Sequence, residues 1–120
     1  DLLKAGAVTG ARDKFEDTPL HYAAVAGHAD AVKDLLEAGA VVDVRTKYGS
    51  TPLVNAAMYG RHRAVLTLLG HGADTEARNA VGCTALYWAR HNAEAQQLNK
   101  WHVTLQALEA AAEIPAVDRK

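Results

Sequence analysis

The chain is poor in the residues that build disulfide-rich, strand-rich and membrane-spanning proteins. It has one cysteine, Cys83, so no disulfide forms within the chain. It has one isoleucine, one phenylalanine and two tryptophans, which disfavours a barrel or sandwich of strands built from branched and aromatic residues. A run of about 18 consecutive apolar residues is missing, so no membrane insertion is expected. The net charge is −1, which lacks the basic excess of nucleic-acid-binding proteins, so no nucleic acid partner is expected.

Alanine and leucine are abundant instead, and both favour closely packed helices. The 120 residues include 25 alanines and 13 leucines, and 49% of the chain is hydrophobic. That share is sufficient for a folded core, and the length corresponds to a single domain over residues 1–120. The composition therefore predicts an all-α domain.

The dominant pattern is an internal repeat with a period of 33 residues. Residues 18–50 and 51–83 are identical at 14 of 33 aligned positions without a gap, where composition alone gives about two or three. The same offset aligns residues 1–17 with the second half of a unit, which predicts a partial repeat there. The chain also begins without methionine, so we expect further repeats upstream that contact this partial unit.

Each full unit predicts two short helices followed by a loop. Thr18 and Thr51 suit helix N-caps, and each is followed by a proline at the first helical position, where a missing N–H costs nothing. A glycine nine residues after each threonine suits the left-handed residue that ends a helix. In the first unit the spacing of Val32, Leu35 and Leu36 predicts one apolar face of a second helix. The polar, turn-forming stretch that follows predicts a projecting hairpin-like loop.

The first full unit resembles the ankyrin repeat. The resemblance is carried by Thr18-Pro19-Leu20-His21-Tyr22-Ala23-Ala24, by Gly27-His28 and by Leu35-Leu36-Glu37-Ala38-Gly39-Ala40, and the period is also the same. It implies an all-α ankyrin repeat solenoid of stacked helix-turn-helix units with projecting hairpin loops. It also implies an intracellular location, and structural rather than catalytic roles for His21 and His28.

The last unit, residues 84–120, is predicted to be a divergent C-terminal cap. Ala93 stands where the preceding units have glycine, and an insertion falls near residues 96–101. A last helix is predicted over residues 103–113, ending before Ile114-Pro115.

No arrangement of residues in the sequence predicts catalysis or a metal site. The six histidines show no zinc-ligand spacing with cysteine, so a metal-dependent enzyme would require them to converge in the fold. Cys83 lies in a variable loop position without a neighbouring cation or base that would activate it. Glycine-rich phosphate loops and nucleophile-elbow motifs are absent from the sequence. We therefore predict that the chain is not an enzyme and uses no cofactor or metal.

The resemblance implies a concave surface formed by the loop tips and the exposed side of each first helix. The residues predicted to contact a partner there are Lys14, Phe15, Asp17, Lys47, Tyr48, Ser50, Met58, Tyr59, Val81, Trp88 and His91. Many of these side chains are aromatic or aliphatic, and contiguous exposed side chains of that kind mark binding surfaces. In the alternative interpretation, Phe15 and Tyr48 pack along neighbouring loop tips and only stiffen the loops.

These features predict a non-catalytic protein-protein interaction module. Its partner is expected to be another protein, or another part of the same parent chain, with Tyr48, Met58 and Tyr59 at the centre of the contact. The alternative is a regulatory ankyrin segment of a larger enzyme or channel whose functional domain lies outside this chain. The sequence does not identify the partner, because a repeat scaffold does not determine its ligand.

Overall fold

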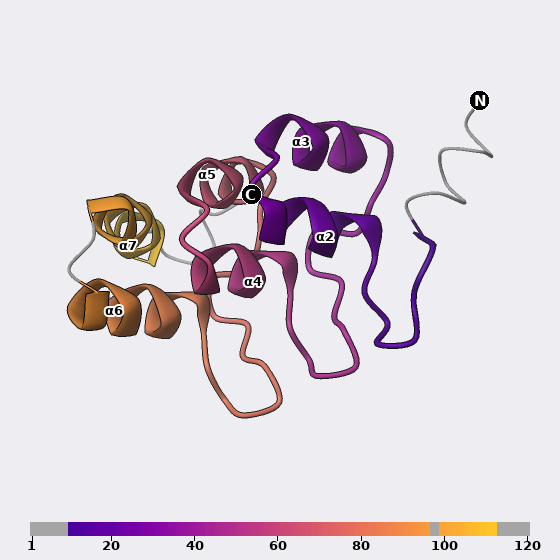
Figure 1. The fold of residues 1–120 in the computed structure, drawn as a ribbon. Coiled ribbons are helices and arrows are strands. Elements are labelled where there is room, and N and C mark those ends of the chain that lie inside the picture. The colour runs from indigo at the N-terminus through magenta and orange to yellow at the C-terminus, as the bar shows by residue number, and fades with distance from the viewer. Residues whose placement is uncertain (1–9, 97–98, 113–120) are drawn as a thin grey trace.

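A computed structural model of the chain describes residues 10–96 and 99–112 (Figure 1). Its helices are α2 (Pro19–Ala26), α3 (Ala29–Glu37), α4 (Pro52–Met58), α5 (His62–Gly70), α6 (Ala85–Gln96) and α7 (Asn99–Ala112). No strand occurs within these described ranges. The predicted all-α architecture is therefore confirmed, whereas most of the predicted partial repeat, residues 1–9, lies outside the described residues.

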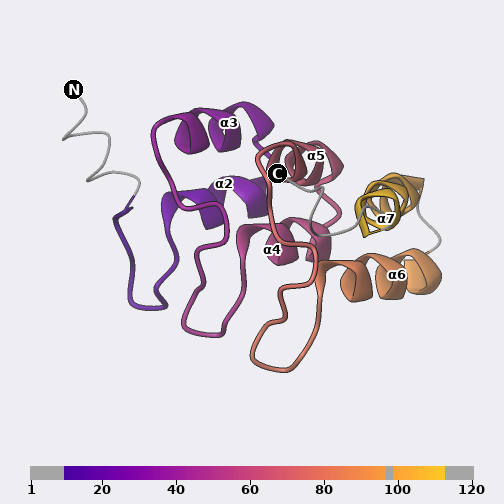
Figure 2. The same ribbon diagram turned by 180° about the vertical axis from the view of Figure 1, so that it is seen from behind.

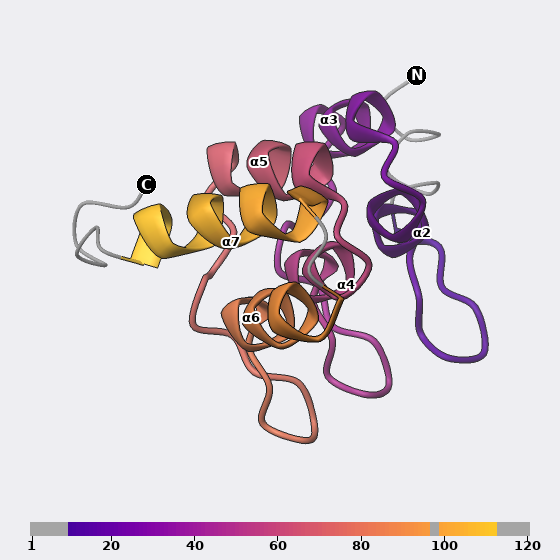
Figure 3. The same ribbon diagram turned by 60° about the vertical axis from the view of Figure 1, so that its left-hand side comes forward.

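The helices form three pairs that stack side by side. Within the pairs α2 packs on α3, α4 on α5 and α6 on α7. Between the pairs, α4 lies between α2 and α6 in one row, and α5 lies between α3 and α7 in a second row (Figure 3). The loops that lead into α2, α4 and α6 all project from the same side of the stack (Figures 1 and 2). This arrangement is the helical repeat solenoid that the sequence predicted.

The predicted starts of the first helices are confirmed. α2 and α4 each begin with proline directly after threonine, and the Thr51 hydroxyl accepts the Val54 N–H at 3.3 Å. Thr84 does the same for the third pair, accepting the Tyr87 N–H at 3.1 Å although no proline follows it. Threonine therefore satisfies a free N–H at the start of α4 and of α6.

His21 connects its own helix to the loop of the next layer. Its ring is 1% exposed. The Thr18 N–H donates to Nδ1 at 3.1 Å, and Nε2 donates to the Ser50 carbonyl at 2.9 Å. These partners require the neutral ring with its proton on Nε2, an assignment made from the hydrogen-bond network. Burial lowers the pKa of His21 more than the hydrogen bond to Ser50 raises it.

His21→Val should remove a pH-dependent part of the stability. The substitution copies Val54, which occupies the same position in the next repeat. It should cost about 2 kcal/mol at pH 7.5, because it leaves the buried Thr18 N–H unpaired and removes one of the two hydrogen bonds of the Ser50 carbonyl, which keeps the one from the Thr46 N–H. Folding lowers the pKa of His21, so the stabilising contribution of its neutral ring is complete above the usual pKa of about 6.5. That contribution falls as the pH drops through the lower pKa of the folded protein. Urea unfolding should therefore show the difference between wild type and variant shrinking toward pH 5, and parallel pH profiles would contradict this role.

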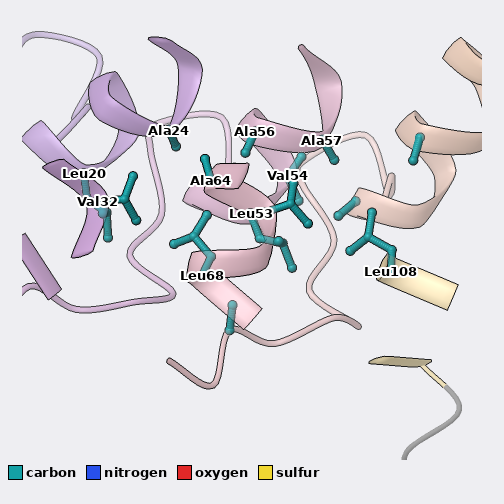
Figure 4. Packing of buried hydrophobic residues seen from close by; sticks show 14 of the residues in the cluster. Leu20, Ala24, Val32, Leu53, Val54, Ala56, Ala57, Ala64, Leu68 and Leu108 are labelled. Carbon is teal, nitrogen blue, oxygen red and sulfur yellow. The ribbon is translucent and has the colours of Figure 1, made fainter. Parts of the chain in front are cut away.

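The core is a continuous row of leucines, valines and alanines that runs through all three layers (Figure 4). Leu20, Leu53 and Leu108 are each no more than 1% exposed. Ala24, Ala56, Ala57 and Ala64 are fully buried at 0% exposure, where the helices of neighbouring layers meet. Small side chains at these contacts let the layers approach closely, which explains much of the chain's alanine.

The third pair differs from the prediction. The last helix begins at Asn99, four residues before the predicted start, and its predicted end at residue 113 lies outside the described residues. α6 runs on through Ala93, because no glycine stands there to end the helix. As a result α6 and α7 have 12 and 14 residues, against seven to nine in the other helices. Much of the predicted insertion therefore lengthens these two helices.

Candidate functional site

Each projecting loop is closed from within by one side-chain oxygen. The oxygens belong to Asp13, Thr46 and Asn79, which recur at the repeat interval. Each accepts the backbone N–H groups two and four residues later, at 2.9 to 3.3 Å. Local bonds of this kind favour a tight turn, so the three loops share one shape although their sequences differ.

A row of three arginines then links the loops, and the first two donate to the loop that follows their own. The Nη1 of Arg12 donates to the Arg45 carbonyl at 3.0 Å, and the Nη1 of Arg45 donates to the Arg78 carbonyl at 2.6 Å. Each arginine also donates to a carbonyl in its own loop, four residues later, at 2.8 to 3.4 Å. We call this the arginine ladder. The repetition of arginine at positions 12, 45 and 78 was visible in the sequence, but its role became evident only from the hydrogen bonds between loops.

Backbone hydrogen bonds join the same loops at their tips. The Lys47 N–H donates to the Phe15 carbonyl at 2.9 Å, and the Ala80 N–H donates to the Tyr48 carbonyl at 2.9 Å. Together with the arginine ladder, these bonds hold the three tips in one continuous ridge. Side chains on the tips are consequently positioned before any ligand arrives.

The predicted aromatic and aliphatic tip residues are exposed on this ridge. Phe15, Tyr48 and Val81 are 40%, 57% and 78% exposed. The Phe15 and Tyr48 rings stack with centroids 6.3 Å apart, and the Lys14 ammonium lies 5.1 Å from the Phe15 centroid. The stacking proposed as an alternative therefore occurs, but it leaves a large part of each ring open to solvent. Lys47 is exposed as well, and Asp17 is partly buried.

Ser50 is not part of this exposed ridge. It is only 8% exposed, and its carbonyl accepts the hydrogen bond from the His21 ring of the preceding layer. The repeat alignment placed Ser50 beside exposed loop residues, but the imidazole covers it. We therefore remove Ser50 from the set of contact residues.

The first helices of the pairs, α2, α4 and α6, carry further exposed side chains. Tyr59 at the end of α4 is 47% exposed, whereas Met58 is partly buried. The Asn92 amide donates to the Met58 carbonyl at 3.1 Å, so the end of α4 is held by α6. Tyr22 on α2 is 57% exposed and donates its hydroxyl proton to the Asp13 carboxylate. This bond lowers the pKa of Asp13 and raises the pKa of Tyr22, and it ties the helix to the first loop.

An aromatic cluster on α6 adds to these exposed side chains. Tyr87 stacks on His91 with centroids 6.0 Å apart, and Trp88 meets both rings edge-on at 5.5 and 6.4 Å. Tyr87 and His91 also line a cleft of about 310 Å³. Tyr87 is 49% exposed. The sequence did not predict this exposure, because Tyr87 occupies the repeat position of His21 and Val54, which are both buried. No described layer packs against this side of α6, so the same position is open there.

These side chains form one surface, which we call the loop face: the exposed residues of loops 12–17, 45–50 and 78–83 together with those of α2, α4 and α6. No group of three metal-ligating side chains converges within residues 10–96 and 99–112, and Cys83 there is a partly buried free thiol. None of the helices in those ranges is long and apolar enough to cross a membrane. The chemistry that the loop face offers is apolar contact, hydrogen bonding and charge.

Comparison with known proteins identifies the repeat. A family model described as ankyrin repeats, in three copies, matches residues 1–79. A search of curated proteins found no match. The matched span covers the loops and helices of the first two described layers and ends in the third loop.

Proposed function

Because the chain belongs to the ankyrin repeat family, whose members are generally protein-protein interaction modules and typically not catalysts, we propose that it binds a protein partner through its loop face. The observation that carries this proposal is the combination of exposed rings and fixed loops. Tyr48 is 57% exposed on the ridge joined by the arginine ladder, and Tyr59 is 47% exposed at the end of α4. Large rings held in place lose little conformational entropy on binding.

The proposal assigns separate roles to the residues of the loop face. Phe15, Tyr48 and Val81 provide apolar contact at the loop tips, and Tyr59 and His91 provide it on the helices. Lys14, Asp17 and Lys47 supply charge at the rim, where each contributes little to affinity alone. Met58 and Trp88 are partly buried and support the exposed rings next to them in sequence.

The double variant Tyr48→Ala/Tyr59→Ala should weaken partner binding at least about tenfold, since each aromatic anchor of a protein interface contributes about 1 kcal/mol or more. The probe is a displayed random-peptide library selected on the immobilised chain, followed by titration of the enriched peptides. Val41→Ala is the control, because Val41 is 66% exposed but lies in the turn after α3, outside the loop face. It should leave affinity within about twofold. Equal affinities for wild type and double variant, with unchanged thermal unfolding, would refute this placement.

A further inference from the structure

Charge is strongly segregated along the stack, although the whole chain is nearly neutral. Residues 12–44, which form the first loop, α2, α3 and the following turn, contain seven acidic and three basic side chains, a net charge of −4. The equivalent residues 45–77, which form the second loop, α4, α5 and the following turn, contain four basic and two acidic side chains, a net charge of +2. The first layer is therefore acidic and the second is basic.

On the loop face the basic character extends into the third layer. Residues 45–60 and 78–92 contain Arg45, Lys47, Arg78 and Arg90 but no aspartate or glutamate. Arg90 is neutralised by an ion pair with Glu109 at 3.0 Å. Arg45 and Arg78 donate to backbone carbonyls, which satisfy their hydrogen bonds without cancelling their charge. Lys47 is exposed.

A second group of cations lies where α4 meets α5. Arg61, His62 and Arg63 line a cleft of about 240 Å³ together with Gly60. The Arg61 Nε donates to the Val25 carbonyl at 2.8 Å, whereas Arg63 is exposed. The end of α4 that carries Tyr59 is therefore next to Arg61 and Arg63, which form no ion pair within the described residues, as Tyr48 is next to Lys47.

From this distribution we propose that the partner of the loop face is an acidic peptide segment that carries an aromatic or aliphatic anchor residue. The inference rests on the proposed function and adds the chemistry of the ligand. Exposed rings at Tyr48 and Tyr59 would receive the anchor. Carboxylates beside the anchor would meet Lys47 on the loop face and Arg63 at the adjoining start of α5, and opposite charges steer the encounter and select the partner. The carboxylates of Asp13, Glu16 and Asp17 in the first loop repel the same ligand and so favour its position over the second and third layers.

A nucleic acid fits these observations less well than an acidic peptide. Tight binding of nucleic acid takes several phosphate contacts, commonly about six to ten. Here Arg45, Arg61 and Arg78 already use their guanidinium groups on backbone carbonyls. The first layer, with a net charge of −4, stands directly beside the basic one. One or two carboxylates with an apolar anchor need far fewer free cations.

The test uses the same random-peptide selection and then measures charge dependence. Enriched peptides should be net negative, and their affinity should fall at least about tenfold between about 50 and 500 mM NaCl. Lys47→Glu and Arg63→Glu should each weaken binding about tenfold, and the milder Lys47→Gln about threefold. Lys33→Glu makes the same charge change on α3, within the acidic layer, and should alter affinity less than about twofold.

The possible outcomes separate this inference from the proposed function. Neutral or basic enriched peptides that still require Tyr48 and Tyr59 would overturn the acidic-ligand inference and leave the proposed function standing. Enriched peptides whose binding ignores both tyrosines would overturn both. Binding of single-stranded oligothymidine as tight as that of the best peptide would overturn the inference in favour of a nucleic acid. Thermal unfolding of each variant shows that a loss of affinity is not a loss of fold.

Discussion

Leu53→Ala should lower the free energy of unfolding by about 4 kcal/mol, toward the upper end of the range for leucine truncations in a packed core. Leu53 is 0% exposed in the middle layer, where α4 is packed on α2, α5 and α6. A cavity there is enclosed on several sides, so the surrounding helices have little freedom to collapse into it. The effect is measured by urea unfolding followed by circular dichroism.

Leu86→Ala is the matched control in the third layer. Leu86 occupies the same repeat position as Leu53 but is only partly buried, because no described layer covers the other side of α6. Its truncation should cost about 1–2 kcal/mol, since part of the removed surface already contacts water. Equal losses in the two variants would contradict a stack in which each layer is stabilised chiefly by its neighbours.

Gly49→Ala should destabilise the protein by about 3 kcal/mol, much more than the replacement of a turn glycine by alanine usually does. Gly49 has a φ of 76°, in the left-handed region where a Cβ is strained. A Cβ at this site would also lie 3.0 Å from the backbone nitrogen of Ala80. That N–H donates to the Tyr48 carbonyl, so the added methyl group would push apart the second and third loops.

Gly82→Ala isolates the conformational strain from this clash. Gly82 is the equivalent residue of the third loop, with a φ of 87°, but an added Cβ there meets nothing within 4 Å. The substitution should cost about 1 kcal/mol of stability, because the strain of alanine in the left-handed region is partly offset by the lower conformational entropy of the unfolded chain. Hydrogen exchange at the Ala80 amide should accelerate in Gly49→Ala and remain near wild type in Gly82→Ala. The clash explanation would be wrong if the two variants had equal stabilities.

Features that depend on a few neighbouring residues were predictable from the sequence. Thr51 with its following proline predicted the start of α4, and the glycines after the first helices predicted their ends. These signals act within one turn of helix, so their effect does not depend on what the rest of the chain does. The third pair departed from the prediction for the same local reason, because Ala93 does not stop α6 as a glycine would.

Features that depend on the neighbouring layer were not predictable in the same way. Ser50 was expected at the surface, and the His21 ring of the preceding layer buries it. Tyr87 was not expected there, and it is 49% exposed because α6 lacks a described neighbour on that side. The arginine ladder was present in the sequence only as a repeated residue type. Its bonds join carbonyls 33 positions away, which no local pattern specifies.

The sequence by itself determined the repeat unit, its helices, its loops and the family to which the chain belongs. It also contained the charge segregation, but the net charge of −1 concealed it. Only the tertiary structure decided which copies of each repeated position are exposed and which cations remain uncompensated. The physical reason is that helix caps and turns are local, whereas burial and charge pairing are properties of contacts between layers, and those contacts differ at each position along the stack.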